Sequence, residues 1–247
     1  MRRVNWRSVI LYYVLACAFS WPFFWWRDMN SESWRHWDVP RPVKTASYMW
    51  GPGLAAIVSL ATFRRSHPRR VSIFGRSATR SITFFAVPFG LLLLTGVSSM
   101  HRWQLLGVGL VGFAIVLGEE LGWRGFLQDA LYSLSPVKRY MLIGALWEFW
   151  HFTNRTTSGQ PLAALSIRLA IFYAVAMVLS LLIGEAVEKS LSISVAVTMH
   201  WWINAVLADF AGLRTTVVFL VSIPFWIWML KRWSAAGKRA AQGAALA

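Results

Sequence analysis

Long apolar runs separated by short basic segments dominate this sequence of 247 residues. Apolar residues make up 57% of the chain and charged residues only 14%, against about 25% charged in an ordinary soluble domain. A membrane-spanning helix needs about 20 mostly apolar residues. Eight stretches approach that length, at residues 8–26, 46–63, 81–100, 105–127, 140–152, 163–183, 191–210 and 217–230. The sequence therefore predicts an all-α membrane protein, an eight-transmembrane-helix bundle.

The distribution of basic residues predicts how the chain crosses the membrane. If the N-terminus lies inside, the cytosolic segments hold most of the loop Arg and Lys residues, including the clusters at 64–80 and 231–239. Basic loops stay on the cytoplasmic side. We therefore expect both termini in the cytosol and a location in the cytoplasmic membrane. Residues 1–233 read as a single multi-pass domain and 234–247 as a short basic tail.

The net charge of +15 is compatible in principle with nucleic-acid binding. The basic residues fall between apolar runs, however, so contact with anionic lipid and membrane topology explain them better. We therefore expect a lipid bilayer as a partner and no nucleic acid. The single cysteine, Cys17, excludes an internal disulfide and a cysteine-based metal cluster.

Charged residues interrupt the fourth apolar run. A charge at bilayer depth costs at least about 2.5–3.5 kcal/mol, so such a residue is expected to face the protein interior. Glu120 and Arg124 are four residues apart, share a helix face and can pair. Glu119 is rotated by about 100° from Glu120 and is not the natural partner of Arg124. The alternative is a helix end that carries ordinary charges.

Two later runs carry histidines. The fifth run contains Trp147, Glu148 and His151, and Glu148 either pairs with His151 or lies at the outer face. The seventh run contains His200 and Asn204, four residues apart and therefore on one face. Side chains of this kind also serve simply as hydrogen-bonding contacts between membrane helices.

The three segments that carry these residues lie at similar depths in the membrane. Counted at about 1.5 Å per residue from the ends of their runs, Glu119, His151 and His200 all fall in the cytosolic half of a hydrocarbon core of about 30 Å. Residues that only join neighbouring helices would not need to agree in depth. The three segments are therefore expected to meet at one site.

Together these residues resemble a known family. Glu-Glu-x-x-x-Arg at 119–124, Trp-x-x-x-His at 147–151 and His-x-x-x-Asn at 200–204 look like the motifs of the type II CAAX prenyl endopeptidases. This family of intramembrane proteases is also called CPBP or Abi and includes lysostaphin-resistance-type bacterial proteins. The resemblance covers residues 105–210. It implies an eight-helix core with a site open to the cytosol.

The resemblance also implies roles for the site residues. Glu119 would activate the attacking water together with His151, His200 and Asn204 would hold the oxyanion, and Glu120 with Arg124 would shape the site. Two features depart from the family pattern. Trp147 stands where Phe is more usual, and the segment at 152–154 reads Phe-Thr-Asn where Leu-Pro is common.

The expected function is therefore an intramembrane endopeptidase that acts on a peptide or membrane-protein substrate without a metal cofactor. One alternative is a Zn²⁺-dependent version of the same protease, with Glu119, His151 and His200 as ligands, because two histidines and a carboxylate form a recognised catalytic set. Another is a non-catalytic membrane immunity or scaffold protein. A transporter is disfavoured because the chain shows no internal repeat. The sequence indicates neither the substrate nor the oligomeric state.

Overall fold

The computed structural model describes residues 3–29, 33, 36, 38, 40–63, 70–97, 100–155 and 161–245, with 28–29, 154–155 and 234–245 described by their backbone alone. Within this part of the chain the structure is helical and has no strand, which confirms the all-α class. The basic residues at 64–69 and the side chains of the predicted tail lie outside the described residues. The backbone of most of that tail continues the last helix.

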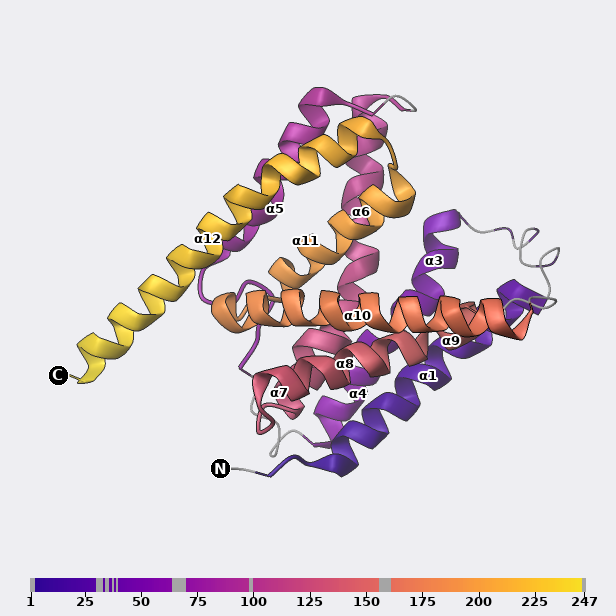
Figure 1. The fold of residues 1–247 in the computed structure, drawn as a ribbon, viewed down its shortest axis with the longest axis horizontal. Helices are drawn as coiled ribbons and strands as arrows, with labels where there is room; N and C mark the ends of the chain where they lie inside the picture. The colour runs from indigo at the N-terminus through magenta and orange to yellow at the C-terminus, as the bar shows by residue number, and fades with distance from the viewer. Residues whose placement is uncertain are drawn as a thin grey trace. The chain divides into compact units, whose positions relative to one another are not determined.

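The chain divides into two compact units. The first contains Met1–Arg70 and Ala114–Gly184, and the second contains Val71–Phe113 and Glu185–Ala247. The helices, in chain order, are α1 (Trp6–Met29), α3 (Arg41–Met49), α4 (Gly51–Thr62), α5 (Ala78–Thr95), α6 (Arg102–Glu120), η1 (Leu121–Leu127), α7 (Gln128–Ala130), α8 (Pro136–Trp150), α9 (Phe152–Arg155), α10 (Leu162–Ser190), α11 (Ile193–Asn204), η2 (Ala205–Asp209) and α12 (Leu213–Ala245) (Figure 1). The boundary between the units falls inside α6 and inside α10.

Each of the eight predicted runs contains helix, but only five helices of the described chain are long and apolar enough to cross a membrane. They are Trp6–Arg27, Ala78–Thr95, Arg102–Ala130, Leu162–Ser190 and Leu213–Trp233. The prediction of eight full spans was therefore too high by this criterion. The membrane class itself is confirmed, and the protein is a multi-pass membrane protein.

The other three runs form shorter helices for local reasons. The run at 46–63 breaks at Trp50, because Pro52 lacks an amide hydrogen and stands at the start of α4. Helix α8 has 15 residues, or about 22 Å, which is shorter than the hydrocarbon core. Helix α11 has 12 residues and passes directly into η2.

In the first unit, small residues let α4 and α6 approach closely. A Cβ atom on Gly53 of α4 would lie 2.6 Å from the carbonyl oxygen of Gly118, and one on Gly118 would lie 2.6 Å from Cγ of Trp50. Contacts of this kind exclude any larger side chain and are typical of packed membrane helices. The backbone immediately before Glu119 is therefore held against the start of α4.

Aromatic donors join α1 to α8 in the same unit. The hydroxyl of Tyr13 donates to the carbonyl of Leu146, and Nε1 of Trp21 donates to the carbonyl of Trp150, both at 3.0 Å. Nε1 of Trp150 donates in turn to the carbonyl of Ala16 at 3.3 Å. Tyr13 and Trp21 thus reach backbone carbonyls on both sides of Trp147 and hold α8 against rotation about its own axis.

In the second unit, α12 lies along α5 (Figure 1), and α11 begins at a tight backbone turn. The amides of Ile193 and Ser194 donate to the carbonyls of Ser72 and Ile73 at 2.9 and 3.0 Å, which satisfies two donors that a helix start leaves without partners. Gly75, with φ of 57°, lies against the backbone of this turn, where a Cβ would come within 2.3 Å of a carbonyl oxygen. Only glycine fits there.

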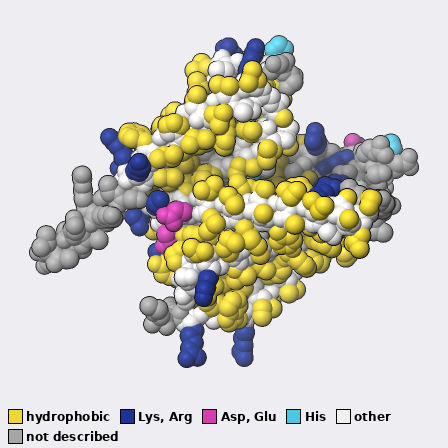
Figure 2. Space-filling view, viewed as in Figure 1, with side chains coloured by type: hydrophobic (Ala, Val, Ile, Leu, Met, Phe, Trp, Pro, Cys, Tyr) yellow, Lys and Arg dark blue, Asp and Glu magenta, His cyan; other side chains and the backbone are white. Residues whose placement is uncertain are grey.

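Apolar side chains also cover most of the visible surface, and few charged side chains interrupt them (Figure 2). Examples on the spanning helices are Leu94 at 70% exposure and Ile171 at 57%. Apolar exposure on this scale is costly in water and is expected of helices that face lipid.

Candidate active site

The last turn of α6 holds two buried carboxylates. Glu119 and Glu120 are both 0% exposed, and each belongs to the apolar span at Arg102–Ala130. A buried carboxylate remains charged only if cations or hydrogen-bond donors stabilise it. Glu119 and Glu120 have different partners: Glu119 accepts a hydrogen bond from Trp147, and Glu120 pairs with Arg124.

The indole of Trp147 contacts Glu119. Nε1 of Trp147, on α8, donates a hydrogen bond of 2.9 Å to Oε2 of Glu119. Trp147 is itself 5% exposed, so the bond lies in an apolar, water-poor environment where it is stronger than at a surface. The two residues are 28 positions apart in the chain, and the sequence did not predict this contact.

Glu120 forms the ion pair that its spacing predicts. Nη1 of Arg124 lies 3.0 Å from Oε1 of Glu120, and both side chains are 0% exposed. The guanidinium of Arg124 also lies over the face of the Trp147 ring, 4.8 Å from its centroid, within the range of a cation–π contact. Trp147 therefore contacts Glu119 with its edge and Arg124 with its face.

Two of the three helices that carry motif residues, α6 and α11, change to π-helix directly after Glu120 and Asn204. Helix η1 follows Glu120, and the amide of Gln128 donates to the carbonyl of Trp123, five residues earlier. Helix η2 follows Asn204, and the amide of Phe210 donates to the carbonyl of Ala205. Short π-helical segments occur frequently at functional sites, and the sequence analysis missed both.

His151 ends α8 one helical turn after Trp147. Its Nδ1 atom lies 2.9 Å from the carbonyl oxygen of Trp147, and its ring lies 5.8 Å from the Trp147 ring. A carbonyl oxygen only accepts hydrogen bonds, so Nδ1 carries the proton in the neutral ring and Nε2 carries the lone pair. His151 is 14% exposed at its side chain, more than the buried carboxylates.

The position of Glu148 decides between the two alternatives that its spacing left open, a partner of His151 or a residue of the outer face. The residue is 3% exposed and therefore buried, and its Oε2 atom lies 4.0 Å from Nδ1 of His151. That distance is at the limit of an ion pair. The carbonyl of Trp147 is the closer acceptor for this ring nitrogen.

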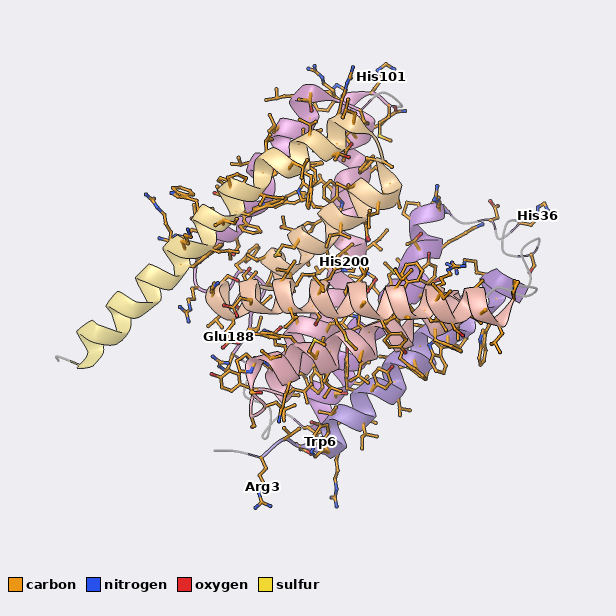
Figure 3. All side chains as sticks on the ribbon, viewed as in Figure 1. Arg3, Trp6, His36, His101, Glu188 and His200 are labelled. Atoms are coloured by element: carbon orange, nitrogen blue, oxygen red, sulfur yellow. The ribbon has the colours of Figure 1, made fainter. Side chains whose placement is uncertain are left out.

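His200 and Asn204 lie in the second unit, on the last two turns of α11 (Figure 3). His200 is 4% exposed, and Trp201 and Trp202 beside it are at 1% and 0%. Trp201 packs edge-on against Phe85 and Phe89 of α5, and Trp202 packs against α12. Successive helix residues point about 100° apart, so these two anchors fix the direction of the face that His200 shares with Asn204.

Within the first unit, the structure brings Glu119, Glu120, Arg124 and His151 together around Trp147. His200 and Asn204 share one helix face within the second unit. In the described part of the chain, no group of three or more His, Cys, Asp and Glu side chains has the arrangement of a metal site.

The fold and these residues define a class: a multi-pass membrane protein with a buried carboxylate, a histidine and a second polar pair on its apolar helices. Residues 101–206, which include all six predicted site residues, match the family model described as Type II CAAX prenyl endopeptidase Rce1-like. This part of the chain is therefore similar to the type II CAAX prenyl endopeptidases, which supports the resemblance drawn from the motifs.

A curated relative supports the same assignment. CAAX prenyl protease 2 from Methanococcus maripaludis is 31% identical over 117 residues, a stretch that covers 42% of this chain and 43% of the relative. The match thus spans less than half of the length of that relative.

Proposed function

We propose that the protein is an intramembrane endopeptidase that hydrolyses a peptide bond with a water activated by Glu119 and His151. The observation that carries this proposal is the fully buried Glu119, held by the Trp147 indole at 2.9 Å, with the ring of His151 against the same tryptophan. A carboxylate and an imidazole in one apolar environment are a recognised pair for moving a proton.

The proton transfers follow from this arrangement. Glu119 accepts a proton from the attacking water while the oxygen of this water bonds to the scissile carbonyl carbon. The lone pair on Nε2 of His151 holds that water in place and shares the proton. When the carbon–nitrogen bond breaks, the proton goes to the leaving amine, and the two products are a carboxylic acid and an amine. General acid–base catalysis of this kind contributes about 10²–10⁴-fold.

His200 and Asn204 are proposed to stabilise the oxyanion. Both side chains offer N–H donors and lie on one face of α11, which Trp201 and Trp202 hold in a fixed rotation. Prepositioned donors need no reorganisation as the negative charge develops, and each contributes about 2.7–4 kcal/mol in comparable sites.

The proposed mechanism needs no metal ion, and Glu120 and Arg124 act as a neutral pair that shapes the site. The zinc-dependent version, with Glu119, His151 and His200 as ligands, makes a distinct prediction. A chelator would abolish turnover, and Zn²⁺ would restore it together with stoichiometric binding to the purified protein. Full activity in the presence of chelator is the result expected here.

We propose that the substrate is a peptide or membrane protein and that the site opens toward the cytosol, with both termini on that side of the cytoplasmic membrane. The positive-inside distribution of loop charges supports this orientation. Orientation is tested by replacing Cys17 with alanine, adding single cysteines at either terminus and labelling them with an impermeant maleimide. Labelling in lysed cells but not in intact cells is expected.

The central experiment compares two glutamates. The purified protein, reconstituted in liposomes, is given a panel of membrane-anchored peptides with C-terminal extensions. Glu119→Gln should abolish cleavage because the amide cannot accept the proton of water. Glu185→Gln makes the same chemical change at a side chain that is 53% exposed, and it should leave cleavage unchanged. Full activity of Glu119→Gln would contradict the mechanism. A wild-type protein that cleaves no peptide, with a cellular phenotype that Glu119→Gln preserves, would instead favour a non-catalytic immunity or scaffold role.

A further inference from the structure

We propose that Trp147 is a positioning residue for the reaction: it fixes the direction of the Glu119 carboxylate and couples the charge of Arg124 to it through the indole ring. This inference rests on the proposed function, since it assigns a role within the same site.

The first step is the hydrogen bond itself. The indole Nε1–H is a donor only, and it lies 2.9 Å from Oε2 of Glu119. Phenylalanine has a ring of similar apolar character but no donor. Because both residues are buried, a lost bond would not be replaced by bulk water, and a hydrogen bond to a charged group is worth more than a neutral one. In this chain the carboxylate direction therefore depends on the tryptophan.

The second step is the position of Arg124. Its guanidinium lies 4.8 Å from the centroid of the same ring while its Nη1 atom pairs with Glu120. A cation over an aromatic face attracts ring electron density, and neighbouring polar groups in a low dielectric polarise one another. Arg124 therefore strengthens Trp147 as a donor. The ion pair of Glu120 and Arg124, which the sequence predicted only to shape the site, is thereby connected to Glu119, the proposed base.

The third step is the rigidity of α8. Tyr13 donates to the carbonyl of Leu146, and Trp21 donates to the carbonyl of Trp150, so the residues on both sides of Trp147 are tied to α1. The helix cannot rotate without breaking these bonds. Hydrogen bonds outside the site thus fix the direction in which the indole N–H of Trp147 points, as expected of a residue that positions a catalytic group.

The test removes the donor and keeps the ring. Trp147 is replaced with β-(3-benzothienyl)alanine, an isostere with sulfur in place of N–H, and separately with phenylalanine. We expect the isostere to lower kcat by about ten- to hundredfold, the loss expected for a hydrogen bond to a charged group, with KM little changed because no substrate contact is removed. Trp147→Phe should lower kcat at least as much.

Two other buried tryptophans serve as matched controls. Nε1 of Trp123 makes no hydrogen bond with the residues that the structure describes, so the isostere at this position should leave kcat unchanged. Nε1 of Trp226, a buried residue of α12, donates to the carbonyl of Phe84 at 2.9 Å. The isostere there should lower the melting temperature but not the kcat of the folded protein. This pair separates the loss of a buried hydrogen bond from the loss of the bond to Glu119.

A second measurement does not depend on turnover. In protein labelled with ¹⁵N at the indole, the Trp147 resonance is identified by its absence from Trp147→Phe. This resonance should shift in Glu119→Gln, where the acceptor loses its charge, and should stay in place in Glu185→Gln. Wild-type kcat in the isostere, or an unmoved resonance in Glu119→Gln, would overturn the inference. Full turnover by Glu119→Gln would instead overturn the proposed function, and the resonance would still decide whether the contact exists.

Discussion

Nδ1 of His151 lies 2.9 Å from the carbonyl oxygen of Trp147, one helical turn earlier in α8. The contact assigns the ring proton to Nδ1 and the lone pair to Nε2, because the carbonyl can only accept. The nearest acceptor for this ring nitrogen is thus a backbone carbonyl. The end of α8 therefore orients the histidine by its own geometry.

His151→Gln should lower kcat by about 10²–10⁴-fold, the usual contribution of a general acid–base group. The amide keeps a polar side chain but cannot take up a proton at neutral pH. His101→Gln is the control, since His101 is exposed at the start of α6, and it should behave as wild type. Steady-state kinetics in liposomes would measure both variants. A kcat for His151→Gln within about twofold of wild type would remove this residue from the mechanism.

The buried pair of Glu120 and Arg124 should be far more sensitive than an exposed pair with the same spacing. Arg124→Met leaves a buried carboxylate without its cation and should lower the free energy of unfolding by about 3–5 kcal/mol. Lys189→Met breaks the i,i+4 pair with Glu185, whose side chains are 38% and 53% exposed, and should cost at most about 1 kcal/mol.

Denaturant titration in detergent micelles would measure these free energies. Removing both partners, with Glu120→Leu added to Arg124→Met, should cost less than Arg124→Met alone because no unpaired charge remains. Equal effects of Arg124→Met and Lys189→Met would contradict the burial of the Glu120 pair.

Gly118→Ala should destabilise the first unit. The added Cβ would lie 2.6 Å from Cγ and 2.9 Å from Cα of Trp50, so α4 would have to move, at a typical overpacking cost of about 1–3 kcal/mol. Gly107→Ala, in the same helix, meets nothing within 4 Å and should stabilise the protein by about 0.5–1 kcal/mol. Thermal melts of the two variants should therefore shift in opposite directions.

His200→Ala and Asn204→Ala should each lower kcat by about 10²–10³-fold if they hold the oxyanion. Asn204→Asp is the sharper test, because it preserves shape but replaces the amide donor with a negative charge. It should be at least as inactive as Asn204→Ala. Residues that act as a unit are not additive, so the double variant should lose less than the product of the two losses. Substantial activity of Asn204→Asp would argue against an oxyanion role.

Several features could be predicted from the sequence because they depend on composition or on spacing within one helix. The membrane class follows from the low charge content and the long apolar runs. The ion pair of Glu120 with Arg124 and the shared face of His200 and Asn204 follow from helical periodicity. The number of full spans was overestimated, because hydropathy does not register the break before Pro52 or the early end of α8 at His151.

The sequence by itself predicted the residues of the candidate site, since polar side chains in apolar helices are rare and costly and therefore indicate function. The tertiary structure alone decided how Glu119 is held. Its partner, Trp147, is 28 residues away on another helix, and the two meet only because glycines let α4 pack against α6 and aromatic bonds to α1 set the rotation of α8. Contacts between helices depend on packing, and no periodicity within a single helix encodes them.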